Sequence, residues 1–77
     1  MSAKEMFEEL GYEIPYWQKD HTIQYLKHYD FNDETMHISI VFYKRPKEVY
    51  IEGLITIKEL EAINKQVEEL GWLGDKE

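Results

Sequence analysis

His28 and His37 are the side chains in this 77-residue chain whose type and spacing best suit chemistry. Each lies in a segment that alternates apolar and polar residues. A hairpin centred on the turn-rich residues between those segments places the two imidazoles opposite one another. Two imidazoles can bind a transition metal, and Glu52 can add a third ligand if the next strand is adjacent. The alternative is that both histidines face solvent on the outer side of a sheet.

No other constellation indicates catalysis. Asp20 and His21 are adjacent in the sequence, but no Ser or Cys nucleophile with an oxyanion-hole context accompanies them, and the chain has no cysteine. It also lacks a glycine-rich phosphate loop. A core this small leaves little room for a pocket of roughly 300 Å³, the lower size of small-molecule sites. We therefore expect neither an enzyme nor a bound cofactor.

Two near-repeats mark the ends of the expected helices. The letters Glu-Glu-Leu-Gly-Tyr at residues 8–12 return as Glu-Glu-Leu-Gly-Trp at residues 68–72. Each follows an apolar stripe at helical spacing and puts glycine where a helix ends. Ser2 with Glu5, and Thr56 with Glu59, match the capping-box pattern at the two starts. The chain therefore begins and ends with a helix.

The middle of the chain predicts three strands, at residues 22–29, 36–43 and 48–54. The first two pair with Tyr25 opposite Ile40, because that register sets apolar against apolar. A second turn at residues 44–47 leads to the third strand and sets Tyr43 opposite Tyr50. Trp17, in the preceding loop, is expected over an edge of the core.

These elements predict one α+β domain spanning residues 1–77, a two-layer fold in the order αβββα with both helices on one face of the sheet. The expected core consists of the apolar residues that share the inner faces: Met6, Phe7, Leu10, Ile23, Tyr25, Ile38, Ile40, Phe42, Val49, Ile51, Leu60, Ile63, Val67 and Leu70.

The sheet face away from the helices is the first candidate surface for a partner. Tyr43, Tyr50 and Val41 lie there with His37 and His28, and aromatics with polar tips are enriched in interface hot spots. The alternative is that tyrosine simply favours strands and stabilises cross-strand pairs.

Carboxylates at the helix ends are the second candidate surface. Glu68 and Glu69, like Glu8 and Glu9, oppose the helix dipole in a last turn. Parallel helices merge the two pairs into one acidic patch, whereas antiparallel helices separate them. Solubility alone is the simpler explanation.

The formal net charge is −7, with 16 acidic and 9 basic residues. This balance argues against direct binding to nucleic acid or to an anionic membrane, both of which need lysine and arginine. No apolar run approaches the ~20 residues of a membrane span, and the first residues lack the apolar core of a signal peptide. We expect a cytoplasmic protein that is a monomer or a weak homodimer.

Residues 7–13 and 56–72, with the alternating strands between them, resemble small uncharacterised proteins encoded by phages and prophages of Gram-positive bacteria. The resemblance covers most of the chain but carries no catalytic or binding residue. It implies a protein expressed in an infected or lysogenic host.

Three functions remain open from the sequence. The leading hypothesis is a non-enzymatic accessory protein, of phage type, that binds an unknown protein. The second is a small metal-binding or hydrolytic enzyme that uses His28 and His37. The third is an acidic mimic of nucleic acid that inhibits a nucleic-acid-binding protein, with an affinity that falls steeply as salt is added.

Overall fold

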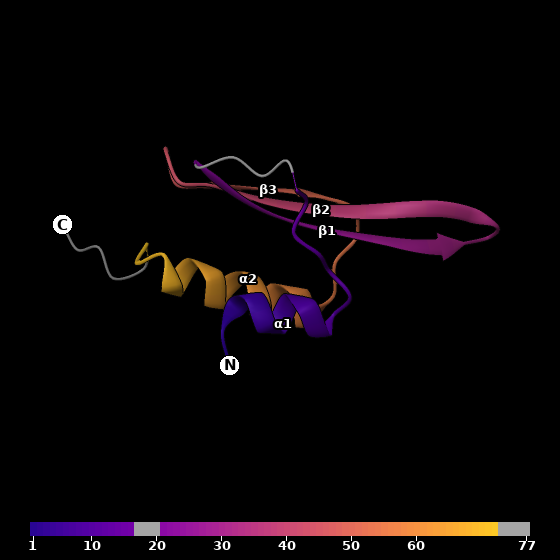
Figure 1. The fold of residues 1–77 in the computed structure, drawn as a ribbon, viewed down its shortest axis with the longest axis horizontal. Helices are drawn as coiled ribbons and strands as arrows, with labels where there is room; N and C mark the ends of the chain where they lie inside the picture. The colour runs from indigo at the N-terminus through magenta and orange to yellow at the C-terminus, as the bar shows by residue number, and fades with distance from the viewer. Residues whose placement is uncertain (17–20, 73–77) are drawn as a thin grey trace. The chain divides into compact units, whose positions relative to one another are not determined.

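The computed structural model describes residues 1–16 and 21–72. Its elements, in chain order, are α1 (Ala3–Glu9), β1 (Thr22–Phe31), β2 (Glu34–Tyr43), β3 (Glu48–Glu52) and α2 (Ile57–Glu69) (Figure 1). The strands form one antiparallel sheet in the order β1-β2-β3, so the predicted α+β class and element order are confirmed.

The chain divides into two compact units. The helical unit comprises Met1–Gly11 and Ile55–Glu77 and contains both helices. The sheet unit is the intervening Tyr12–Leu54. That both helices cover one face of the sheet, and that residues 1–77 form a single domain, remain predictions.

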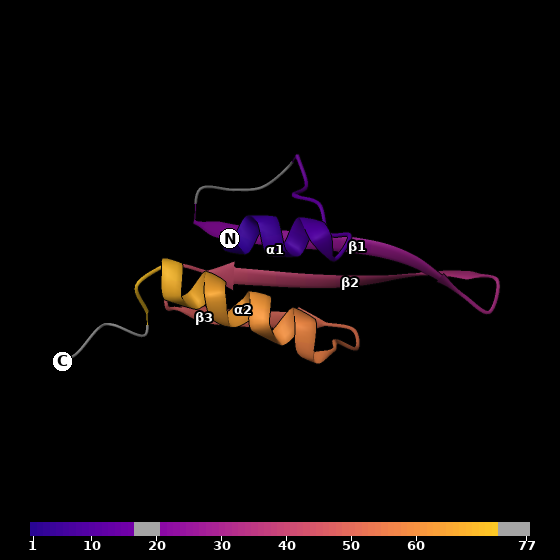
Figure 2. The ribbon, with the colours of Figure 1, turned by 90° about the horizontal axis from the view of Figure 1, so that it is seen from below.

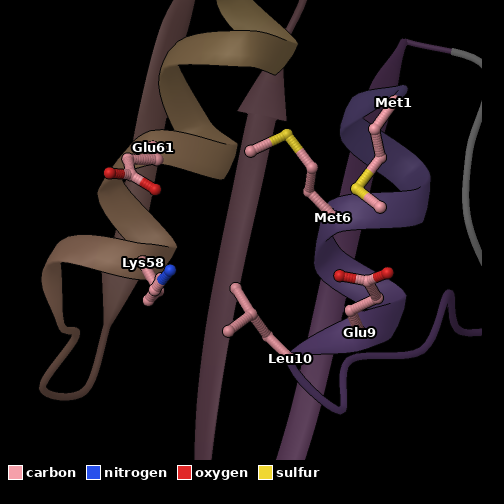
Figure 3. A pocket seen from close by; sticks show the side chains of 6 residues that line it. All are labelled: Met1, Met6, Glu9, Leu10, Lys58 and Glu61. Carbon is pink, nitrogen blue, oxygen red and sulfur yellow. The ribbon is translucent and has the colours of Figure 1, made fainter.

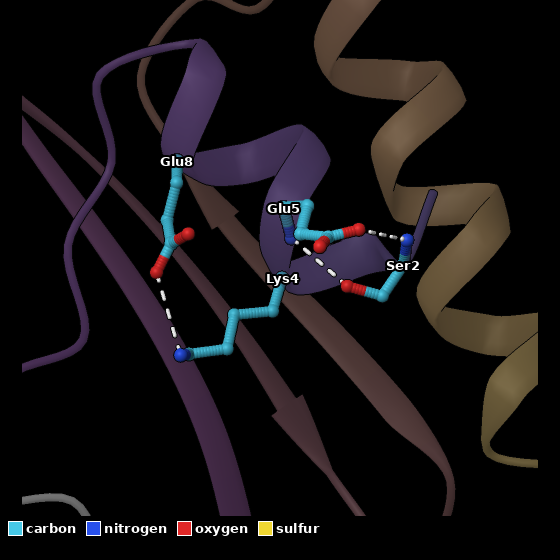
Figure 4. A network of polar contacts seen from close by, with 4 residues as sticks. All are labelled: Ser2, Lys4, Glu5 and Glu8. Carbon is cyan, nitrogen blue, oxygen red and sulfur yellow. Dashed lines mark hydrogen bonds and ion pairs between the residues drawn. The ribbon is translucent and has the colours of Figure 1, made fainter.

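The first helix begins with the capping box that its sequence predicts. The Ser2 hydroxyl accepts from the backbone N–H of Glu5 at 3.1 Å, and the Ser2 N–H donates to the Glu5 carboxylate at 2.9 Å (Figure 4). One turn on, Lys4 and Glu8 form an exposed ion pair at 3.4 Å. Two of the N–H groups that a helix start leaves without intrahelical partners are thereby occupied.

The last helix ends at the predicted glycine. Gly71 has φ 79°, and its N–H donates to the Glu68 carbonyl at 3.0 Å. The Trp72 N–H donates to the Val67 carbonyl at 3.2 Å. This pair of bonds is the Schellman motif, which requires a left-handed residue and therefore favours glycine.

The two helices lie side by side and run antiparallel (Figure 2). The Glu69 carboxylate, at the end of α2, accepts a hydrogen bond from the backbone N–H of Ala3, the first residue of α1, at 2.9 Å. Ala3 and Phe7 of α1 and Ala62 of α2 are fully buried, and Ile63 of α2 is nearly so.

The buried face of α2 differs from the predicted one. Glu59 and Gln66 are buried, at 3% and 6% exposure, whereas Leu60 is 43% exposed. The prediction of Leu60 as a core residue is therefore wrong. The Glu59 carboxylate accepts from both the backbone N–H and the hydroxyl of Thr56, so capping draws this polar side chain inward.

The first hairpin has the predicted register, with Tyr25 opposite Ile40. Its two central residues, Asn32 and Asp33, have φ of 53° and 65°. Two successive left-handed residues are typical of a type I′ turn, whose twist matches that of the flanking strands. The β1–β2 ribbon continues well beyond β3, which pairs only with the last part of β2 (Figure 1).

The second hairpin is shifted by two residues from the prediction. Tyr50 lies opposite Val41, and Tyr43 lies opposite Glu48, so Tyr43 and Tyr50 are not opposite one another. The connection is the four residues 44–47, with a cis peptide bond before Pro46. A shift of two keeps every side chain on its predicted face, because strand side chains alternate with a period of two.

Burial in the sheet unit is not confined to the predicted inner face, because Ser39 and Val41, on the opposite face of β2, are only 7% and 8% exposed. Tyr25, Ile38, Ile40 and Phe42 are buried, but Ile51 is 40% exposed, and its assignment to the core is wrong. Its strand is the sheet edge, with a single neighbouring strand. The remaining predicted core residues are partly exposed: Met6, Leu10, Ile23, Val49, Val67 and Leu70.

The outer edge of β1 carries one extra bridge. Glu13 and Leu26 exchange two backbone hydrogen bonds, at 2.8 and 2.9 Å. Beside this bridge Tyr12 is buried, and the Lys27 ammonium lies 5.0 Å from the centre of its ring. This distance suits a cation–π contact, which fixes the chain after α1 against the strand.

Candidate functional site

A groove lies between α1 and α2, within the helical unit. Met1, Met6 and Leu10 supply its apolar lining, and its volume is about 360 Å³. Met6 and Leu10 project from α1 toward α2, where Lys58 and Glu61 line the opposite wall (Figure 3). Antiparallel packing creates the groove, because it sets the middle and end of α1 beside the first turns of α2.

The surroundings of this groove are negatively charged. Two more open hollows share lining residues with it, one beside α1 alone and one between the two helices. The three together are lined by five glutamates and two lysines: Glu5, Glu8, Glu9, Glu61, Glu68, Lys58 and Lys65. Lys65 forms an ion pair with Glu68 at 3.4 Å. The groove therefore combines an apolar, methionine-containing lining with a surplus of carboxylates around it.

The acidic helix ends do not merge into one patch. Because the helices are antiparallel, Glu9 ends α1 beside the first turns of α2, whereas Glu69 ends α2 beside the start of α1. Glu68 is exposed and paired with Lys65, and Glu69 is engaged with the backbone of Ala3. Both residues are exposed, so Glu69 differs from Glu68 in its backbone partner and not in its exposure class.

The tyrosine-bearing face of the sheet is partly accessible. Tyr43 and Tyr50 are 39% and 50% exposed, and they lie diagonally across β2 and β3. Diagonal cross-strand neighbours are within reach of aromatic side chains. Val41, between them, is only 8% exposed, so a partner can reach little of it.

The histidines lie where the first hairpin register puts them. His28 and His37 are directly opposite and exposed, with ring centres 6.4 Å apart and planes tilted by 50°. Nε2 of His37 lies 3.5 Å from Oε1 of Glu52 on β3, and both side chains are about half exposed. The strand that carries Glu52 is thus adjacent to β2, as the predicted role of Glu52 as a third metal ligand requires.

A pocket of about 410 Å³ adjoins His28 on the outer edge of β1, lined also by Leu26 and by residues 13–16. Within residues 1–16 and 21–72, no three His, Cys, Asp or Glu side chains are grouped so as to hold a metal ion. Trp17 and Asp20, the latter from the Asp20–His21 pair, lie outside the described residues.

The interhelical groove is the feature that the sequence did not predict. Met6 and Leu10 read as core residues from their helical spacing, and nothing local shows that α1 and α2 are antiparallel. The available signal was Met6 in the first helix with Met1 just before it, since methionine is common at adaptable binding surfaces.

Neither described helix is long and apolar enough to cross a bilayer. No protein-family model, curated protein or solved structure matches the chain.

Proposed function

We propose that this chain is a non-enzymatic accessory protein, of phage type, that acts by binding another protein through the groove between α1 and α2. The observation that carries the proposal is the apolar lining of that groove by Met1, Met6 and Leu10. The phage-type assignment depends on the sequence resemblance alone.

The shape of the groove favours a helical ligand. Two parallel or antiparallel helices leave a trough into which a third helix can lay one apolar face, a recurring mode of peptide recognition. Methionine side chains are unbranched and polarisable, so Met1 and Met6 can adjust to the side chains that enter.

The charge around the groove favours a cationic ligand. Glu9 and Glu61 line it directly, and Lys58 is its single lysine among the described residues. Electrostatic complementarity raises the association rate and excludes like-charged partners. We therefore propose as ligand an amphipathic helix of a partner protein, apolar on one side and rich in lysine or arginine on the other.

The other two functions have weaker support. Nucleic-acid mimicry calls for a continuous acidic surface, but the antiparallel helices separate Glu9 from Glu69. A hydrolytic enzyme needs a nucleophile or an activated water beside a base. His28 lines the pocket of about 410 Å³ on the outer edge of β1, but His37 is not among its lining residues, so that pocket does not enclose the pair.

The test uses a synthetic amphipathic peptide of leucine and lysine, about 18 residues or roughly five helical turns long. Its affinity is measured by calorimetry for the wild-type chain and for a double variant, Glu9→Lys with Glu61→Lys. We expect at least a tenfold loss of affinity in the variant and weaker binding at higher salt. Glu34→Lys with Glu48→Lys, a double charge reversal at exposed strand positions of the sheet unit, is the matched control.

The outcomes separate the surfaces. Affinity that survives reversal at Glu9 and Glu61 contradicts the groove. A loss of peptide affinity in Tyr43→Ala and Tyr50→Ala alone indicates that the peptide binds the tyrosine face of the sheet. Equal binding of a peptide in which glutamate replaces every lysine contradicts the cationic ligand.

A further inference from the structure

We infer that His28 and His37 form a two-imidazole site for a divalent transition-metal ion on the β1–β2 ribbon, with Glu52 as the residue that orients His37. The inference is independent of the proposed protein-binding groove, because all three residues belong to the sheet unit. Copper, nickel and zinc ions are the expected ligands, since neutral imidazole suits each of them.

The backbone fixes the spacing of the two ligands. His28 and His37 are direct cross-strand partners, so their Cβ atoms project on the same side of a paired ribbon. The pairs on either side, Lys27 with Ile38 and Tyr29 with Met36, keep the register. Two imidazoles held this way lose little conformational freedom on binding a shared ion, unlike two histidines on a flexible loop.

The distance between the rings is close to what a shared ion requires. With metal–nitrogen bonds of about 2.0–2.1 Å, an ion lies about 3.2 Å from an imidazole centre, so two tetrahedral ligands have ring centres about 5.2 Å apart. The observed separation is 6.4 Å. The rings must approach by about 1 Å, and both side chains are exposed, so side-chain rotation suffices.

The contact with Glu52 supplies a feature that separates this pair from two ordinary surface histidines. Oε1 of Glu52 lies 3.5 Å from Nε2 of His37, which leaves Nδ1 of the same ring for a metal ion. Metal-binding histidines commonly donate their other ring N–H to a carboxylate, which fixes the ring and increases its basicity. Glu52 lies opposite Ser39, which is two residues from His37 on β2. His37 and Ser39 point to the same face of the sheet, so Glu52 is a diagonal neighbour of His37.

The site is a two-ligand site, consistent with the absence of any three-residue metal cluster among the described residues. Its other coordination positions are open to water or to an external ligand, as in catalytic rather than structural zinc sites. We expect modest affinity, in the order copper above nickel and zinc.

The experiment titrates the full chain with Cu²⁺, Ni²⁺ and Zn²⁺ separately, by calorimetry and by ¹⁵N imidazole shifts for Zn²⁺. We expect one ion per chain and at least tenfold weaker binding in His28→Gln and in His37→Gln. Glu52→Gln is expected to weaken binding about tenfold while keeping the stoichiometry. His21→Gln, which removes the third, exposed histidine, is the matched control and should bind as the wild type.

Thermal unfolding without metal shows whether each variant is folded. With metal, the wild type and the His21→Gln control should gain the most stability, Glu52→Gln less, and His28→Gln and His37→Gln least, because an ion that binds only the folded chain raises the melting temperature according to its affinity. Single histidine variants that bind like the wild type, or an equal loss in His21→Gln, overturn the site. Binding unaffected by Glu52→Gln overturns the orienting role of that residue.

Discussion

The carboxylate of Glu69 accepts a hydrogen bond from the backbone N–H of Ala3 at 2.9 Å, joining the end of α2 to the start of α1. A carboxylate in the last turn of its own helix opposes that helix's dipole, but the same group at the N-terminus of a neighbouring helix is favourable. Glu69 thus stabilises α1 at some cost to α2, and its contact links the two helices in the antiparallel arrangement that creates the groove.

Removing this contact should destabilise the chain. Glu69→Ala is expected to lower the free energy of unfolding by about 1–2 kcal/mol, because a hydrogen bond to a charged group is lost at a helix start. Chemical denaturation measures the loss, and faster amide exchange at Ala3 locates it. Glu68→Ala, which removes only an exposed ion pair with Lys65, should change stability by less than about 1 kcal/mol. Equal effects of the two substitutions contradict the contact.

Stability should fall in acid partly through Glu5. The hydrogen bond from the Ser2 backbone N–H to its carboxylate holds the pKa of Glu5 below the usual value of 4.5. A group with a lowered folded-state pKa stabilises the fold fully above the unfolded value, and the contribution is lost as the pH falls through the folded value. Urea denaturation from neutral pH down to below the lowered pKa of Glu5 measures this loss. The free energy of unfolding should fall less steeply with decreasing pH in Glu5→Gln than in the wild type. An unchanged slope contradicts the capping role.

The two positive-φ glycines near the ends of β3 and α2 should respond differently to alanine. At Gly71 (φ 79°) an added Cβ meets nothing within 4 Å, so Gly71→Ala is expected to cost only the left-handed backbone term, about 1–2 kcal/mol. At Gly53 (φ 115°) the Cβ lies 3.0 Å from Cγ1 of Ile38 and 3.3 Å from the His37 carbonyl oxygen. Gly53→Ala should therefore cost more, and the opposite ranking in denaturation midpoints contradicts this geometry.

The orientation of α2 about its axis can be tested with two alanine substitutions. Ile63 is 6% exposed and Leu60 is 43% exposed. Ile63→Ala should lower the free energy of unfolding by about 2–4 kcal/mol, as expected for a buried aliphatic residue, and Leu60→Ala by less than about 1.5 kcal/mol. Both substitutions introduce alanine, and leucine and isoleucine differ in helix propensity by only a few tenths of a kcal/mol, so burial dominates the difference that urea denaturation measures. Equal losses of stability at Leu60 and Ile63 would support the prediction from the sequence that both residues are buried.

The elements and the first hairpin register could be predicted because they depend on local patterns. Alternation sets Tyr25 against Ile40, and glycine at position 71 ends α2, as the structure confirms. The second hairpin register depends on the geometry of residues 44–47, which alternation does not encode. The capping box of Thr56 and Glu59 was predicted, but the apolar spacing of α2 did not show that Glu59 and Gln66 would be buried and Leu60 exposed.

The candidate site was less accessible to prediction. The opposition of His28 and His37 follows directly from strand register, so the sequence predicts it. The interhelical groove instead depends on the antiparallel direction of α1 and α2. In the structure, the end of α2 contacts the start of α1 through the hydrogen bond between Glu69 and Ala3. That contact joins two residues distant in the sequence, and neither periodicity nor capping signals report it.

The most direct test of the proposed groove uses the three methionines of the chain. Met1 and Met6 line the groove, and Met36, 38% exposed on the hairpin of the sheet unit, is a built-in control. The methyl NMR signals of all three are followed as the leucine–lysine peptide is added. The account predicts saturable shifts at Met1 and Met6 and none at Met36. Shifts at Met36 with Met1 and Met6 unmoved contradict it.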